Sequence, residues 1–361
     1  MKIEKREIKL YPEVLKTFRE TSGYTIAEIA KKLKTSENKI ISVEEGKSLF
    51  TLNQIKKLAE IYKRPLAAFF SDSIPELPEL VDYRINREKR LTPDVYLAKR
   101  RAKYLSEKIK EISGKKNQIP SFSKGLAAEE LAKEFKIKLK IEIVKSKKSD
   151  DKFLEYYKRM LEEKLTIIIM EYPLRANDVR AFSIYSDIPA VVLNESDKPS
   201  IKLFSLFHEI CHIVNNNTGI CSLEIEQQNQ SVETYCNRFA AEFLVPSDDF
   251  KSEVSKFSQV DEEAIQQLKK IYGVSKQVIM IRLLEFGYID KKRYETFKKR
   301  IEEKIDQKKF GKRDWDKVFL NRVGNLPLQE VKNAYNKQLI TFYDASSILD
   351  LKIKYAEKFI A

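Results

Sequence analysis

The sequence has little histidine and cysteine and no long apolar run. Only two His and three Cys occur among its 361 residues. Such a small, odd number of Cys argues against a disulfide-stapled scaffold and is typical of a reducing compartment. The longest apolar runs, such as 165–170, are far shorter than the roughly 20 residues that span a bilayer, and residues 1–5 lack the apolar core of a signal peptide. We therefore expect a cytoplasmic protein with no membrane partner.

Apolar residues and positive charge, in contrast, are abundant. Hydrophobic residues make up 42% of the chain, which is enough for packed cores. The length suggests two or three domains. The 68 Lys and Arg outnumber the 54 Asp and Glu, for a net charge of +14. A basic balance is compatible with binding to nucleic acid but does not establish it.

Hydrophobic periodicity divides the chain into four parts, and we expect a mostly helical α+β fold. Short helical patterns fill 1–72, and 73–120 reads as a linker followed by a basic helix over 91–112. The apolar stripe of that helix favours either packing on its own chain or bracing a homodimer. Residues 121–290 mix helix and strand patterns, and 291–361 resemble a small helical module.

The mixed part contains the patterns that matter for function. We expect strands over 137–143, 165–170, 181–185 and 190–193. The first of these rests on strict alternation of apolar and charged residues from Ile137 to Ile143. We expect strong helices over 200–214 and 231–245, and two shorter helices within 262–286.

Both histidines of the chain lie in one short motif, His208-Glu-Ile-Cys-His212. Residues four apart share a helix face, so the two imidazoles can bind one zinc ion. Glu209 is then placed to accept a proton from an activated water molecule. The alternative is a buried helix with two hydrogen-bonded histidines. Burying two imidazoles and a carboxylate is costly unless something satisfies them, which favours the metal.

A catalytic zinc takes three protein ligands, and the chain has no third His. Glu233 shares one stripe of the helix over 231–245 with small and apolar residues, so we favour it as the third ligand. Glu224, Glu226 and Cys236 are rivals, and Cys would make a softer, more structural site. On the same helix, Glu242 falls on the opposite face and is expected to be solvated.

Two separated segments carry a resemblance to a known family. Phe204–His212 (FSLFHEICH) and Glu233–Pro246 (ETYCNRFAAEFLVP) are similar to the ImmA/IrrE metallopeptidases. The resemblance implies a zincin-like fold with a small sheet against the active-site helix. It also implies His208, His212 and Glu233 as ligands of zinc, with manganese as an alternative, and Glu209 as general base. The sequence departs from the family at Lys202, where an Arg is common, and at Cys211, where a small residue is frequent.

The first 72 residues resemble an Xre-type helix-turn-helix domain over Leu15–Arg19, Gly23–Leu33 and Ser36–Glu45. In that fold the helix that starts at Ser36 enters the major groove. The resemblance thus implies DNA contacts from four polar side chains, Ser36, Asn38, Lys39 and Ser42. A protein-binding helical domain that has lost DNA binding is the alternative, because position 26 is Ile where many relatives carry Gln.

Together these features predict a zinc-dependent, site-specific endopeptidase that is also a transcriptional regulator. Family members cleave a helix-turn-helix repressor and so derepress stress or prophage genes, and a repressor or antitoxin protein is the substrate we expect here. Two other interpretations stay open: a DNA-binding transcription factor with a non-catalytic metal site, and the toxin component of a toxin–antitoxin pair.

Overall fold

The computed structural model describes residues 7–8, 10–73, 91–142, 150–175, 179–215, 227–303 and 314–360. Of the linker expected over 73–90, residues 74–90 lie outside them. The chain forms two compact units: Met1–Arg101 with Leu174–Ala176, here unit 1, and Ala102–Pro173 with Asn177–Ala361, here unit 2. Their boundary falls inside helix α5 (Pro93–Ser113). The finer division into four parts stays a prediction.

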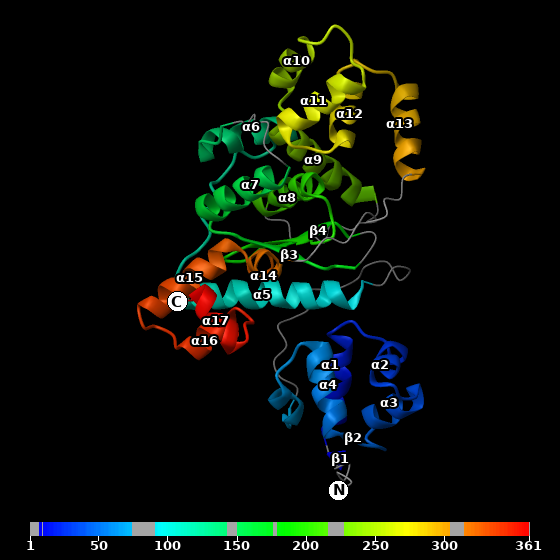
Figure 1. Ribbon diagram of the computed structural model, residues 1–361, viewed down its shortest axis with the longest axis vertical. Helices are drawn as coiled ribbons and strands as arrows, with labels where there is room; N and C mark the ends of the chain where they lie inside the picture. The colour runs from blue at the N-terminus through cyan, green and yellow to red at the C-terminus, as the bar shows by residue number, and fades with distance from the viewer. Residues whose placement is uncertain are drawn as a thin grey trace. The chain divides into compact units, whose positions relative to one another are not determined.

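Unit 1 begins with a bundle of short helices (Figure 1). The elements are β1 (Glu7–Ile8), α1 (Pro12–Glu20), α2 (Ile26–Leu33), α3 (Glu37–Glu44), β2 (Phe50–Thr51), α4 (Leu52–Tyr62) and a 3-10 helix (Leu66–Phe70). β1 pairs antiparallel with β2. Local capping sets the helix starts: Thr25 and Glu28 form a reciprocal capping box on α2, and Ser36 caps α3. The apolar faces meet in one core around Phe18, Ile40 and Ile55.

Unit 2 is built around a three-stranded sheet of order β3-β5-β4. β3 (Ile168–Tyr172) runs parallel to β5 (Ala190–Asn194), and β4 (Ala181–Ile184) runs antiparallel to it. β3 and β5 are buried along most of their length because helices cover the sheet on both faces. Within the sheet, β4 is an edge strand.

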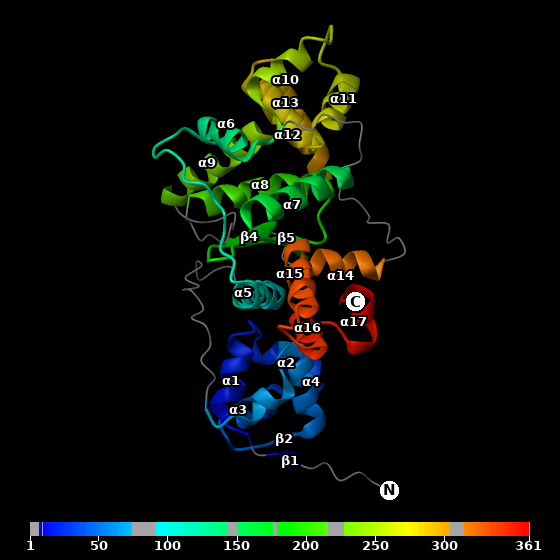
Figure 2. The same ribbon diagram turned by 90° about the vertical axis from the view of Figure 1, so that its left-hand side faces the viewer.

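The helices of unit 2 lie in layers on the two faces of this sheet (Figures 1 and 2). One face carries α7 (Asp150–Leu165) and α8 (Pro199–Val214), with α6 (Ala128–Leu139) and α9 (Gln227–Leu244) beyond them. The other face carries the part of α5 after Ala102 and two C-terminal helices, α14 (Trp315–Val323) and α15 (Asn325–Asn336). The remaining helices are α10 (Ser247–Val254), α11 (Glu262–Tyr272), α12 (Lys276–Glu285), α13 (Lys291–Glu303), α16 (Phe342–Ile348) and α17 (Ile353–Ile360). Among the described residues, no helix is long and apolar enough to cross a membrane.

The strand expected over 137–143 is wrong. Helix α6 runs to Leu139, and Ile137 is 75% exposed. The buried residues Leu131, Phe135 and Leu139 recur every four positions, so the helical period overrides the short alternation that follows it. The other three strands are confirmed within a few residues, although the first begins at Ile168 because α7 extends to Leu165. The apolar stripe of α5 is buried within the chain.

A buried carboxylate attaches the C-terminal helices to the sheet. Glu162 of α7 accepts hydrogen bonds from the backbone N–H of Asn325 (3.0 Å) and Ile169 (3.3 Å) and from the Asn325 side chain (2.8 Å). Gly324 precedes α15 with φ +87°, and a Cβ there would lie 2.9 Å from the Ile169 carbonyl oxygen. Only glycine therefore fits where α15 approaches β3 this closely.

A second buried carboxylate, that of Glu171 in β3, lies between two lysine ammonium groups. Its oxygens are 2.9 Å from Lys158 Nζ of α7 and 2.6 Å from Lys202 Nζ of α8. Burial raises the pKa of Glu171, but the two positive charges outweigh it and hold the pKa below its usual range. This triad joins the sheet to both helices on one face.

Replacing Glu171 with Gln is expected to lower the free energy of unfolding at neutral pH by roughly 2–3 kcal/mol, because two buried ammonium groups lose a charged partner. The folded-state pKa is depressed, so the contribution of Glu171 is present above the pKa of the unfolded chain and is lost as the pH falls through the folded-state pKa. As the pH is lowered below about 4, the free energy of unfolding should therefore fall less in the variant than in the wild type. Urea unfolding in pH steps measures this, and parallel profiles would contradict it.

Candidate metal centre

The two helices that carry the candidate site, α8 and α9, pack against each other beside the sheet. Pro199 starts α8, and the helix is apolar nearly all round, so it is buried on most sides. The buried Lys202–Glu171 pair secures its first turn to β3. His208, Glu209 and His212 follow along α8 and are 7%, 1% and 2% exposed. They are thus held by packing rather than by a surface loop.

Three side chains converge between these helices. His212 Nε2 lies 3.2 Å from His208 Nε2. Glu233 of α9 places Oε2 3.1 Å from His208 Nε2 and Oε1 3.5 Å from His212 Nε2. Tetrahedral ligands bound to zinc at 2.0–2.1 Å lie about 3.3 Å from one another. The donor set therefore has both the chemistry and the spacing that hold a zinc ion.

Asn237 is a member of this site that the sequence analysis did not single out. Its Oδ1 lies 2.9 Å from His208 Nδ1. An amide oxygen only accepts, so this contact calls for a proton on Nδ1 and leaves Nε2 as the nitrogen that could bind a metal. The sequence did carry a signal for Asn237: it lies four residues after Glu233 on α9, and residues at that spacing share one helix face.

Two buried thiols, Cys211 and Cys236, lie on the inner side of the site. Cys236 Sγ is within 4.8 Å of a ring nitrogen of each histidine. A hydrogen bond with Cys211 and burial raise the pKa of Cys236, while the hydrogen bond with His212 opposes them. By its position Cys236 remains a rival to Glu233 for the role of third metal ligand. The Glu233 carboxylate lies within 3.5 Å of both imidazoles.

Electrostatics in the site favour a positive charge. Burial lowers the pKa of His208, but the hydrogen bond that its ring donates to the Glu233 carboxylate and the charges of Glu209 and Glu233 outweigh it, so the pKa is raised overall. The carboxylates thus make this a place where a cation is stabilised. The other rivals for the third ligand, Glu224 and Glu226, lie outside the described residues.

The solvated position expected for Glu242 is wrong. Its side chain is 1% exposed, and its Oε2 lies 2.6 Å from Arg282 Nη2 of α12. Ser247 donates to the same carboxylate through Oγ (2.5 Å) and the backbone N–H (3.1 Å). Glu242 does face away from Glu233, but α10 and α12 cover that side of α9, and the sequence of α9 alone could not reveal them.

In unit 1, the four residues predicted to bind DNA lie on or next to α3. Ser36 Oγ accepts from the Lys39 N–H (3.2 Å), and Lys39 Nζ donates to Ser48 Oγ (2.5 Å). Asn38 is exposed and Ser42 is partly buried. Glu44 of α3 forms a two-pronged ion pair with Arg19 of α1, at 2.7 and 2.8 Å, which compensates one negative charge on this helix.

Two family models match the chain. Residues 15–69 match a helix-turn-helix model, HTH_3. Residues 162–284 match the IrrE N-terminal-like domain, Peptidase_M78, and this match includes α8 and α9. The chain joins a helix-turn-helix domain to an IrrE N-terminal-like domain. The resemblance seen in the sequence is confirmed in both parts, as is the mostly helical α+β fold.

Other comparisons are remote. A Mycobacterium tuberculosis transcriptional regulator of known structure is similar at 12% identity with a TM-score of 0.31. The similar region covers 52% of this chain and 51% of that regulator, so this chain spans about half of it. No curated protein matches the chain. Lys202, which the sequence analysis noted as a departure from the family resemblance, lies in the matched segment, and its ammonium group makes the buried pair with Glu171.

Proposed function

We propose that the chain is a zinc-dependent endopeptidase and transcriptional regulator. The observation that carries this proposal is the convergence of His208 Nε2, His212 Nε2 and the Glu233 carboxylate at 3.1–3.5 Å. The match to Peptidase_M78 supports a metallopeptidase. In this proposal these three residues hold the metal, which is zinc or manganese, and the helix-turn-helix domain binds DNA through Ser36, Asn38, Lys39 and Ser42.

The residues around the metal divide the chemical work. Zinc, when bound, activates water at neutral pH and polarises a peptide carbonyl. Glu209 accepts the proton of the attacking water and then delivers it to the leaving amine nitrogen. Asn237 keeps the proton of His208 on Nδ1. Among the described strands β4 lies at one edge of the sheet, and we propose that this edge offers main-chain hydrogen bonds to an extended substrate, which would lie along it as an added strand.

Metal content is the measurement that tests the site. The purified full chain should hold about one zinc ion, and Glu233→Ala should lower the zinc affinity by about 100-fold or more, because one of three protein ligands is lost. Thr234→Ala is the matched control, since this neighbouring side chain on α9 is exposed. A wild-type chain that takes up no metal when zinc is offered would overturn the peptidase proposal and leave a DNA-binding regulator.

Removal of the Asn237 amide is expected to weaken zinc binding by about 10-fold, within the range seen when partners of metal-binding histidines are lost. The variant Asn237→Ala lets His208 protonate either nitrogen, so part of the population presents the wrong tautomer. Competition with a chelator measures the affinity. Asn237→Asp, which keeps an acceptor oxygen, should retain more of it, and equal affinities for wild type and Asn237→Ala would contradict this role.

A second candidate function follows from Cys236, which lies within 4.8 Å of both imidazoles. If Cys236 joins Glu233 as a ligand, four protein ligands close the site, as in structural zinc centres. The chain would then be a DNA-binding regulator with a non-catalytic metal. The variant Cys236→Ser distinguishes the structural from the catalytic site. Zinc binding should weaken strongly if Cys236 is a fourth ligand, and it should stay almost unchanged if the site is open and catalytic.

The substrate we propose is a helix-turn-helix repressor, or an antitoxin if the chain is a toxin component. Cells that express the wild-type chain should show new protein N-termini that are missing from cells expressing Glu209→Gln. Mass spectrometry of protein N-termini identifies the cleaved protein and the bond. Toxicity that disappears in the same variant, with a neighbouring small protein as the cleaved partner, would favour the toxin interpretation.

A further inference from the structure

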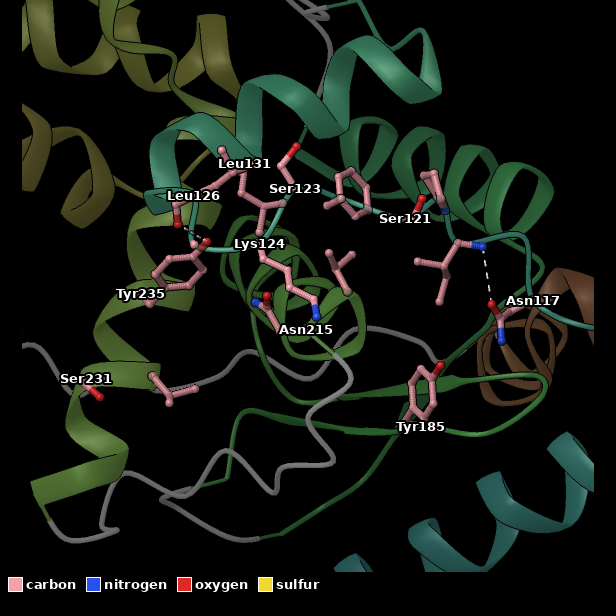
Figure 3. A pocket seen from close by; sticks show the side chains of 16 residues that line it. Asn117, Ser121, Ser123, Lys124, Leu126, Leu131, Tyr185, Asn215, Ser231 and Tyr235 are labelled. Carbon is pink, nitrogen blue, oxygen red and sulfur yellow. Dashed lines mark hydrogen bonds between the residues drawn. The ribbon is translucent and has the colours of Figure 1, made fainter.

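A cavity of about 870 Å³ lies within unit 2, beside the two helices that carry the candidate metal ligands. Both helices that carry the candidate ligands also line it: α8 through Val214 and Asn215, and α9 through Ser231, Val232 and Tyr235. The opposite wall is the segment 117–126, and Tyr185 follows the edge strand β4 (Figure 3). The volume lies within the 300–1,000 Å³ typical of ligand pockets. A peptide lying on β4 would thus have side chains within reach of the cavity.

Hydrogen bonds hold the 117–126 wall at both ends. At one end the N–H of Asn117 donates to the Asp187 carbonyl oxygen (2.6 Å), and the N–H of Gln118 donates to that of Leu165 (2.8 Å). At the other end Tyr235 Oη donates to the Leu126 carbonyl oxygen (3.0 Å). These contacts hold this wall of the cavity at both ends.

Polar side chains make up much of the cavity lining, and the formal charge among its described residues is positive. Among the described residues that line it, Lys124 is the only one with a full charge at neutral pH. Figure 3 shows its side chain reaching into the pocket beside Asn215. Hydroxyl and amide groups complete the polar lining: Asn117, Ser121, Ser123, Tyr185, Asn215, Ser231 and Tyr235. Glu129 and Glu130, whose negative charges act on Tyr235, are not part of the lining, and Glu130 accepts from the Ala127 N–H (2.9 Å).

We propose that this cavity binds an Asp or Glu side chain of the peptide substrate and that Lys124 selects it. The ammonium group of Lys124 supplies the countercharge, and the hydroxyl groups of Ser121, Ser123 and Tyr185 in the lining can donate to the remaining carboxylate lone pairs. A Lys or Arg side chain in the same place would meet a like charge and, among the described residues of the lining, no carboxylate. This inference rests on the proposed peptidase function, and it names the substrate class that this peptidase would prefer.

Peptide hydroxamates provide the probe, because the hydroxamate group binds a zinc ion directly. Two peptides that differ only in an Asp or an Asn at one position are compared, and that position is moved along the peptide. The zinc-loaded full chain should bind the best Asp peptide about fivefold more tightly than its Asn partner, the upper range for a partly exposed ion pair. The ratio should shrink at high salt. Lys124→Gln should abolish the preference and Lys124→Arg should keep it, while Lys133→Gln, a lysine of α6 outside the cavity, should leave it unchanged.

The outcomes separate this inference from the proposed function. If the hydroxamates bind but Asp and Asn peptides are equal at every position, or if the preference survives in Lys124→Gln, the selectivity assigned to Lys124 is wrong and the peptidase proposal stands. If no hydroxamate binds the zinc-loaded chain, the proposed metal site itself fails, and this inference fails with it. Protection of Lys124 from reductive methylation by the Asp peptide, read by mass spectrometry, supplies a readout without catalysis.

Discussion

Glu209→Gln is expected to keep zinc bound and to lower the rate of substrate cleavage by about 10²–10⁴-fold, the usual contribution of a positioned general base. Gln has almost the shape of Glu but takes up no proton at neutral pH. The side chain is 1% exposed, so the exchange also removes a buried charge rather than creating one. The measurement is the cleavage rate of the protein identified from its new N-terminus, with metal content determined on the same samples.

A matched control is Glu253→Gln on α10. This glutamate is also buried, at 7% exposure, and α10 carries none of the candidate ligands. Its cleavage rate should stay near that of the wild type. A wild-type rate in Glu209→Gln would overturn the assignment of the general base. Transcriptional regulation that survives in Glu209→Gln, with zinc still bound, would instead favour a regulator whose metal centre is not catalytic.

The parts of the site that follow from local spacing could be predicted from the sequence. His208 and His212 are four apart on a helix, so their convergence needs only the helical repeat. Glu233 was favoured because a carboxylate on a small, mostly apolar stripe needs a partner, and the structure brings it to both imidazoles. Asn237 lies on the same stripe, but a neutral amide gives no comparable signal of a missing partner.

The parts that depend on tertiary partners could not be predicted. The alternation from Ile137 to Ile143 covers too few residues to separate a strand from the end of a helix, and packing of Phe135 and Leu139 decided for the helix. Glu242 was assigned to solvent from its own helix alone, yet its partner Arg282 is 40 residues away along the chain. The spacing of apolar residues in the sequence shows which face of a single helix or strand is buried. It does not show which other element covers the opposite face.

That buried pair supports the second large prediction: Arg282→Met is expected to lower the free energy of unfolding by about 3–5 kcal/mol, the cost of leaving one member of a buried ion pair without the other. Arg282 Nη2 contacts Glu242 Oε2 (2.6 Å), the Val245 carbonyl oxygen (2.7 Å) and Ser247 Oγ (3.0 Å). The arginine thus links α12 to the end of α9 and to the start of α10. The midpoint of urea unfolding, followed by circular dichroism, measures the loss.

Two further variants show whether the charge or the packing is responsible. Glu285 is the other acidic partner of Arg282, and its carboxylate is 45% exposed. Glu285→Ala should therefore lower the free energy of unfolding by less than about 1 kcal/mol. The double variant Glu242→Leu, Arg282→Met should recover much of the stability, because no charge then stays buried without a partner. A double variant as unstable as the sum of the single ones would show that shape, rather than charge, holds α12 against α9. Since α9 also carries Glu233, zinc affinity should fall in Arg282→Met and recover in the double variant, which would connect the stability of this pair to the metal centre on the opposite face of the helix.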